Sequence, residues 1–233
     1  PPTISGVEQE PKSPNYNETV TVSAVVTEPQ NASQVWFVFL GYWDGSTWRN
    51  ITMTLSDGRY VATIPALPYG TVANYKVYGF DKAGNLAVSD VYSYSVTDSY
   101  PPTARIDEPT EGSYLSGKVN VMGFGSDDNF DKMQLFIDEV LVKTWTEAGS
   151  WVYVWDTTTL DDGSHTIKLV VYDKAENTKD ERVTVTVDNT PPSIGTPTWN
   201  PEEPSATQEV TVNVTVTDLG SGLKNVTLWY RID

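Results

Sequence analysis

Apolar and polar residues alternate along much of this chain with a period of two. In the segment TVTVSAVVT, residues 19–27, Val20, Val22, Ala24 and Val26 alternate with mostly polar neighbours. The segment EVTVNVTVT, residues 209–217, repeats the pattern, with its apolar positions at Val210, Val212, Val214 and Val216. A period of two is typical of a β-strand with one face on a core. We therefore predict that both segments are half-buried strands.

Further strand candidates follow at short intervals, and turn clusters such as SDG, DDG and KAGN separate them. The predicted strands lie at residues 34–40, 48–55, 59–64, 73–80, 118–124, 132–138, 165–173 and 182–188. A convincing amphipathic helix pattern is missing, and a parallel sheet needs crossover helices. The pattern therefore predicts an all-β chain of antiparallel β-sandwiches.

Double prolines recur in the chain and predict where modules begin. Residues 75–96 and 167–187 are similar hairpins, and each runs into an Asp followed by Pro101 and Pro102 or by Pro191 and Pro192. Proline fixes φ and has no backbone donor, so a double proline makes a short, stiff linker. Edge-strand breaks inside one domain would explain the prolines less well, because their spacing of roughly 90 residues is the size of one sandwich. We expect modules at residues 1–99, 100–189 and 190–233.

A longer repeat relates the third module to the first. Residues 191–194, PPSI, align with residues 1–4, PPTI, and residues 209–218 align with 19–28 without a gap. Residues 190–233 hold only the early strands of such a module. We expect the missing strands to come either from a longer parent chain or from a neighbouring subunit, and the intact mass of the source protein distinguishes the two.

Composition narrows the class of protein. The chain has 233 residues, of which 39% are hydrophobic and 12% aromatic, so it can fill hydrophobic cores. It has no cysteine, so disulfides and thiolate metal sites play no part. The net charge of −16 comes from 31 acidic and 15 basic side chains, which disfavours nucleic acid as a partner. No apolar run is long enough to predict membrane insertion within this segment. The acidity itself fits simple solubility, a saline habitat or binding of divalent cations.

Two segments carry a resemblance to a known family. Residues 160–177, LDDGSHTIKLVVYDKAEN, and 75–85, YKVYGFDKAGN, resemble the closing strands of bacterial and archaeal immunoglobulin-like repeats of surface or secreted proteins. Residues 67–77 are also similar to a fibronectin type III turn, with Tyr75 as a candidate tyrosine corner. The middle module departs from the AGN form of the hairpin, because Glu176 replaces the glycine.

The resemblance implies tandem immunoglobulin-like sandwiches joined by Pro-Pro linkers, in a cell-surface or extracellular location. It implies a structural or adhesive role as a stalk, an adhesin arm or a filament component. The implied partners are other copies of the chain, other surface proteins or glycans. An alternative from another class is a non-catalytic, carbohydrate-binding accessory region of a secreted hydrolase.

Glycosylation is the modification that the sequence indicates. Asn-x-Ser/Thr triplets begin at Asn17, Asn31, Asn50, Asn213 and Asn225. The strand-borne sites at Asn50, Asn213 and Asn225 are predicted to face solvent, opposite to their apolar neighbours. Threonine-rich strands also generate such triplets by chance, so both interpretations stay open.

Catalytic chemistry is not indicated. His165 is the single histidine and lies at a junction of turn and strand, where the resemblance makes it structural. The acidic pairs at residues 127–128 and 161–162 lie in predicted turns, where aspartate commonly caps the backbone. We therefore expect no enzyme activity, no catalytic residues and no cofactor. Calcium is the exception that we keep open, because oxygen ligands are plentiful around the double prolines, at Asp98, Asp107, Glu108, Asp173 and Asp188.

Tryptophans give one further candidate site. Trp36, Tyr42, Trp43 and Trp48 lie close together in the sequence around YWDGSTW. Trp43 and Trp48 form a candidate aromatic binding patch if their indoles are exposed, since such rings stack on sugars. The competing interpretation is that they form a cross-strand pair that stabilises a hairpin.

Overall fold

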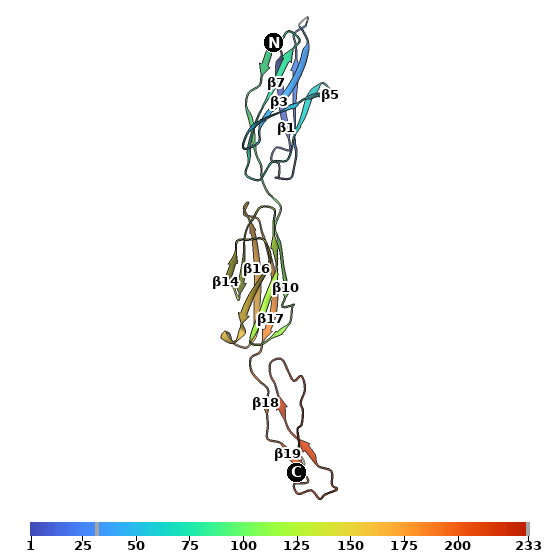
Figure 1. Ribbon diagram of the computed structural model, residues 1–233, viewed down its shortest axis with the longest axis vertical. Coiled ribbons are helices and arrows are strands. Elements are labelled where there is room, and N and C mark those ends of the chain that lie inside the picture. Colours follow the sequence, from blue (N-terminus) through green and yellow to red (C-terminus); the bar gives the residue numbers. More distant parts are fainter. Residues whose placement is uncertain (31–32, 232–233) are drawn as a thin grey trace. The chain divides into compact units, whose positions relative to one another are not determined.

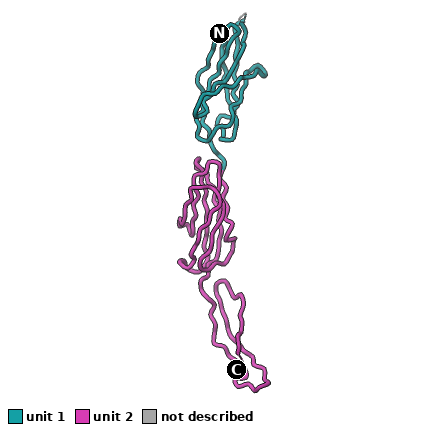
Figure 2. Tube along the Cα trace, viewed as in Figure 1, with its two compact units in different colours: residues 1–100 teal, residues 101–233 magenta. Residues whose placement is uncertain are grey.

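The computed structural model describes residues 1–30 and 33–231, and it divides into two compact units, residues 1–100 and 101–233 (Figure 2). Apart from one 3-10 turn at Thr157–Thr159, the regular structure of the described residues is all strand. The predicted all-β class is therefore confirmed. The predicted boundary between residues 189 and 190 falls inside the second unit and stays a prediction.

The first unit is a sandwich of two antiparallel sheets (Figure 1). One sheet has the order β1 (Thr3–Glu10), β2 (Val20–Thr27), β6 (Arg59–Ile64) and β5 (Thr54–Ser56). The other has the order β4 (Trp48–Thr52), β3 (Val35–Trp43), β7 (Val72–Asp81) and β8 (Leu86–Val88), and β9 (Tyr92–Ser95) also pairs with β7.

The alternating residues of β2 fill the core between these sheets, as predicted. Val20, Val22 and Ala24 are at most 1% exposed. Tyr75 on β7 is also buried, and its hydroxyl donates a hydrogen bond of 2.9 Å to the side chain of Gln9 on β1. The predicted tyrosine corner is therefore wrong, because a corner tyrosine bonds to nearby backbone, whereas this bond joins two different sheets. Burial raises the pKa of Tyr75 to about 12.

Residues 101–188 form a second sandwich. Its three-stranded sheet has the order β10 (Thr103–Glu108), β12 (Lys118–Ser126) and β15 (Gly149–Asp156). Its five-stranded sheet has the order β11 (Tyr114–Leu115), β17 (Thr178–Val187), β16 (Gly163–Asp173), β13 (Phe130–Ile137) and β14 (Val140–Trp145). The short β11 runs parallel to β17, and the other pairs are antiparallel.

The core of this sandwich contains two of the tryptophans. Trp151 and Trp155 on β15 are 3% exposed, and Trp145 packs against the same cluster. The neighbouring strands β10 and β12 approach closely at Gly123, where an added Cβ would lie 2.0 Å from the carbonyl oxygen of Arg105. A glycine is therefore required at this position of β12, beside the irregularity in its pairing with β10.

The remaining strands of the second unit form two short antiparallel pairs. β18 (Ser193–Ile194) pairs with β21 (Val216–Thr217), and β19 (Thr198–Asn200) pairs with β20 (Thr211–Asn213). The predicted strand at 209–217 is thus divided in two. Its valines were expected to face a core, but Val210, Val212 and Val214 are 44%, 37% and 38% exposed. In the part of the chain that the structure describes, no opposing sheet covers them.

Candidate functional site

The predicted aromatic pair lies at one end of the first sandwich. Trp43 and Trp48 are directly opposite each other on β3 and β4, with ring centroids 6.2 Å apart and planes tilted by 60°. Trp48 is half exposed. The loop between them is closed by Asp44, whose carboxylate accepts hydrogen bonds from the amides of Thr47 (2.8 Å) and Ser46 (2.9 Å). These bonds hold the pKa of Asp44 well below its usual value, so the hairpin is fixed by an ionised side chain.

The outer face of the same sheet carries an aromatic row that the sequence analysis missed. Phe39 and Tyr78 stack in parallel with centroids 4.5 Å apart, and Phe37 and Phe80 flank Phe39 at 5.8 and 6.3 Å. The alternation in QVWFVFL held the signal, because Phe37 and Phe39 alternate with buried residues on β3. Phe39 and Tyr78 already cover each other's faces, so the row offers ring edges more than free faces to a ligand.

The other tryptophans do not extend the patch. Trp36 is 70% exposed, but it lies near the opposite end of β3, next to an irregularity in the pairing with β7. Tyr42 is buried in the core. Residues that cluster in the sequence therefore separate in space, and Trp43 with Trp48 remains the compact pair. Its binding role stays a prediction.

His165 lies in the second sandwich, with both ring nitrogens engaged. Nδ1 is 2.6 Å from a carboxylate oxygen of Asp138, and Nε2 is 2.8 Å from the carbonyl oxygen of Asp161. Asp138 also accepts a hydrogen bond from the amide of Thr166. Both neighbours of the ring are acceptors, so the protonated imidazolium satisfies both contacts. The histidine thus ties the turn between β13 and β14 to β16, in agreement with the structural role that the resemblance implied.

A buried aspartate closes the hairpin in each sandwich. Asp173 is 2% exposed, and its carboxylate accepts hydrogen bonds from the amides of Ala175 and Asn177 and from the side chain of Asn177. Asp81 makes the corresponding contacts in the first sandwich. Glu176 has φ of 68°, so the hairpin keeps the left-handed backbone that Gly84 adopts at φ of 86°. The motif DKAGN or DKAEN is therefore a turn-closing device.

The aspartates before the double prolines also bind turn amides. Asp98 accepts from the amide of Tyr100 at 3.0 Å, and Asp188 accepts from the amide of Thr190 at 3.2 Å. Asp107 forms an ion pair with Arg105 on its own strand. These contacts give the acidic residues near the joints structural roles, and calcium binding there stays a prediction.

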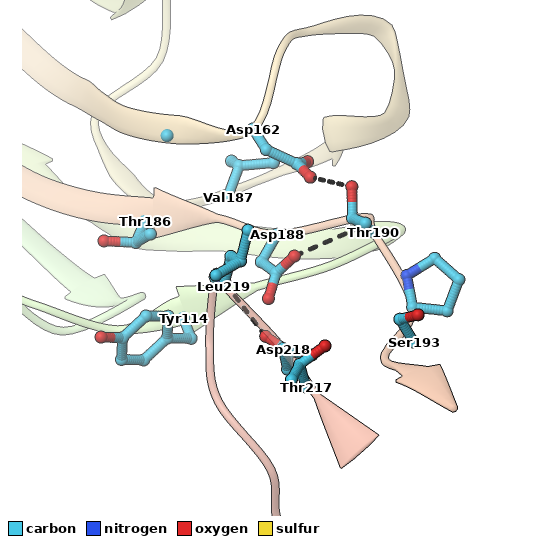
Figure 3. Close-up of a pocket in the computed structure, with 13 residues that line it drawn as sticks. Tyr114, Asp162, Thr186, Val187, Asp188, Thr190, Ser193, Thr217, Asp218 and Leu219 are labelled. Atoms are coloured by element: carbon cyan, nitrogen blue, oxygen red, sulfur yellow. Dashed lines mark hydrogen bonds between the residues drawn. The ribbon is translucent and has the colours of Figure 1, made fainter. Parts of the chain in front are cut away.

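A pocket of about 510 Å³ lies in the second unit beside Asp188. Figure 3 shows Thr190 between Asp162 and Asp188, with dashed lines to both. Hydrogen bonds from Thr190 to Asp162 and from Ser221 to Asp188 hold the pKa of both carboxyls below 3.8. Carboxylates that stay ionised at neutral pH are poor general acids. The two carboxylates of this pocket are therefore held in their ionised form by the hydrogen bonds of the surrounding turns.

The glycosylation triplets are accessible where the structure describes them. Asn17, Asn50, Asn213 and Asn225 are all exposed, and Asn31 lies outside the described residues. Asn50 lies on β4 and Asn213 on β20, whereas Asn225 is outside the strands. Their modification stays a prediction. Among the described residues, the structure forms no helix long and apolar enough to cross a membrane.

Two solved structures illustrate what the chain is similar to. The fibronectin(III)-like modules of CbhA from Clostridium thermocellum are 18% identical over 80% of this chain and 95% of theirs, with a TM-score of 0.36. A tetra-tandem repeat from the extending region of a large adhesion protein is 17% identical over 94% of this chain and 65% of its own, with a TM-score of 0.46.

Sequence comparison finds a family model that matches part of the second sandwich. No curated protein matches the chain. Residues 102–169 match the family model described as a bacterial Ig domain, so the resemblance to bacterial immunoglobulin-like repeats is confirmed over that range.

Proposed function

We propose that this chain is a structural or adhesive repeat region of an extracellular or cell-surface protein, acting as a stalk, an adhesin arm or part of a filament. The observation that carries the proposal is that each sandwich has its own core. The buried cluster of the first lies entirely within residues 20–96, and that of the second lies within 121–187. A module that buries its own core can be repeated along a chain without depending on its neighbours.

The use of polar side chains supports the same role. The buried aspartates Asp81 and Asp173 close hairpins, and His165 ties a turn to a strand. The net charge of −16 keeps such a surface soluble and repels nucleic acid. These polar side chains therefore stabilise the turns and hairpins of the two sandwiches.

Protease treatment of intact source cells tests the location. We expect peptides from both sandwiches to appear in the supernatant while a cytosolic marker stays inside the cells. Recovery of these peptides only after cell lysis would contradict a surface role. Electron microscopy of the released protein then separates filaments with a repeat of one or two modules from single molecules.

Force spectroscopy tests the modular behaviour. When the chain is pulled from its two ends, we expect the two sandwiches to open in separate steps. Each step should release roughly 30 nm of chain, since about 90 extended residues span 3.3–3.6 Å each. One single step for both sandwiches would contradict independent modules.

Glycan binding is a second candidate function, and the half-exposed pair of Trp43 and Trp48 is the observation that favours it. A glycan array measured with the native chain and with the Trp43→Ala and Trp48→Ala variants tests this role. Binding that survives both substitutions would exclude the pair as the site.

Glycosylation supports an extracellular location if it occurs. We propose Asn17, Asn50, Asn213 and Asn225 as modified residues because each is exposed, and Asn31 on the basis of its sequence alone. Peptide mapping of the native protein before and after deglycosylation decides this, and unmodified peptides at all five positions would end the idea.

A further inference from the structure

The aromatic row on the outer face of the first sandwich continues as an apolar surface onto β8. Phe39 pairs with Tyr78 and Tyr78 with Val88, while Phe80 pairs with Leu86. Directly paired residues of neighbouring strands point to the same face of a sheet. Leu86 and Val88 are each 46% exposed. A contiguous apolar patch on an exposed sheet face marks an interaction site.

Gly41 lies beside this row on the same face of β3. The Cβ that Gly41 lacks would lie 3.0 Å from Cε2 of Tyr78 and 3.3 Å from Oδ1 of Asn50. A side chain at this position would therefore meet both groups, and glycine leaves room between them. The edge of the Tyr78 ring and the amide of Asn50 thus border the same space above the backbone of Gly41.

Strand register fixes the position of Asn50 relative to the aromatic side chains. Asn50 on β4 pairs directly with Gly41 on β3, and the pair two residues further along these strands is Trp43 with Trp48. The side chain of Asn50 is exposed. A group attached to it therefore lies between the tryptophan pair on one side and Tyr78 on the other.

We propose that an N-linked glycan on Asn50 packs over Gly41 against the ring edge of Tyr78 and covers this end of the aromatic row. The proposal rests on the modification of Asn50 proposed above and adds what the attached glycan contacts. Asn50 begins an Asn-Ile-Thr triplet and is exposed on β4. The C–H groups of a sugar ring form an apolar surface, so their contact with an aromatic ring removes apolar area of both from water.

The covalent step requires a glycosyl diphosphate as donor and a separate transferase. Nδ2 of Asn50 forms a bond to the anomeric carbon of the donor sugar. The bond from that carbon to the diphosphate oxygen breaks, and the diphosphate leaves with the electron pair. Nδ2 loses one proton to a base of the transferase, so nothing is oxidised or reduced.

Two features favour this glycan over a second copy of the chain as the occupant of the row. The net charge of −16 disfavours the close approach of two copies. A glycan on Asn50 is covalently held beside Tyr78, so its effective concentration there is high and a contact forms without a separate binding partner.

Footprinting of the full chain by radical labelling and mass spectrometry tests the contact directly. The native chain and the Asn50→Gln variant are both isolated from the source organism. We expect a glycan on the Asn50 peptide of the native chain, and heavier labelling of Tyr78 in Asn50→Gln. Tyr114, which is 60% exposed in the second sandwich, is the internal control and should be labelled equally in both chains. The native ring of Tyr78 is measured, so this test holds even if an aromatic variant folds poorly.

Thermal unfolding measures what the contact contributes to the first sandwich. Asn50→Gln should lower its Tm by about 4–8 °C, because covering about 40 Å² of apolar surface has this effect in a domain of about 100 residues. In a Tyr78→Thr background, Asn50→Gln should lower Tm by less than half as much. Phe37→Thr is the matched control, because Phe37 lies on the same face at the other end of the row, and its background should keep the full loss.

The outcomes separate this inference from the proposed function. An Asn50 peptide without a glycan would overturn both the inference and the modification of Asn50, whereas the surface role is tested independently by the protease treatment. A modified Asn50 with equal labelling of Tyr78 in both chains would overturn the inference only, and so would equal Tm losses in the Tyr78→Thr and Phe37→Thr backgrounds. Labelling of Tyr78 that falls with rising protein concentration and not with the glycan would identify a second copy as the occupant and overturn it as well.

Discussion

The hydrogen bonds of His165 should make the second sandwich most stable in mildly acidic solution. Burial of the ring favours its neutral form, but the contacts with Asp138 and with the carbonyl of Asp161 outweigh it and raise the pKa of His165 above 6.5. Burial likewise raises the pKa of Asp138, but the hydrogen bonds from His165 and Thr166 lower it below 3.8 overall. The contact between His165 and Asp138 therefore stabilises the second sandwich most when both side chains are charged.

The direction of each pKa shift sets the pH range in which the pair stabilises the fold. A raised histidine pKa stabilises the fold fully below the unfolded value of 6.5, and this contribution is lost as the pH rises through the folded pKa. A lowered aspartate pKa stabilises the fold above 3.8, and this contribution is lost as the pH falls through the folded pKa. The largest contribution of the pair therefore lies between about pH 4 and pH 6.5.

The size of the effect follows from the geometry. Hydrogen bonds to charged groups contribute about 1.5–3 kcal/mol when they are shielded from water. The side chain of His165 is 11% exposed, but that of Asp138 is 41% exposed, so screening reduces the expected value to about 1 kcal/mol. For a sandwich of this size, that loss lowers Tm by about 4–8 °C.

Thermal unfolding of the native chain and of His165→Gln, at pH 5.5 and pH 9, is the assay. Hydrogen exchange at β16 assigns the transition to the second sandwich. We expect the difference in Tm between the native chain and His165→Gln to be less than half as large at pH 9 as at pH 5.5. Asp138→Asn should produce a similar loss, and the double variant should add little to either. An equal difference at both pH values would refute the charged pair.

Three further predictions concern the two sandwiches. Gly123→Ala should destabilise the second sandwich by more than about 2 kcal/mol in urea unfolding, because the new Cβ meets a backbone oxygen at 2.0 Å; a loss within error would show that β10 moves away freely. Tyr75→Phe should cost about 1–2 kcal/mol, because Gln9 loses its buried donor, and an unchanged unfolding midpoint would contradict this. Glu176→Gly should stabilise the second sandwich by about 1 kcal/mol, because φ at this position is 68° and glycine adopts such a left-handed backbone without strain. Gly84→Ala should destabilise the first sandwich for the same reason. Tm shifts of the same sign in the two variants would contradict this argument from backbone conformation.

Much of the candidate site could be read from local sequence. The hairpin ends Trp43 and Trp48 were predicted to face each other, and they do, because a short turn with flanking strands fixes its own register. The exposure of Asn50 followed from alternation, because its neighbour Ile51 packs against the core. Alternation does not account for the exposure of Asn213, because Val212 and Val214 on either side are exposed as well. The aromatic row was missed because Phe39 and Tyr78 lie on strands whose pairing is set by the whole sheet.

The sequence by itself determined the strand periodicity, the tandem organisation and the relation between residues 193–217 and the first two strands. These are properties of neighbouring residues and of repeats, and a period of two assigns a residue to one face or the other wherever the strand lies. Burial does not follow from the period alone. Val22 and Val212 have the same local pattern, yet one is fully buried and the other is 37% exposed.

The tertiary structure decided which strand covers which face, and therefore which polar groups meet. It paired Tyr75 with Gln9 across two sheets and placed two acceptors around His165, contacts between residues far apart in the chain. A local pattern specifies that a face is apolar, whereas only the packing of distant strands specifies what removes it from water.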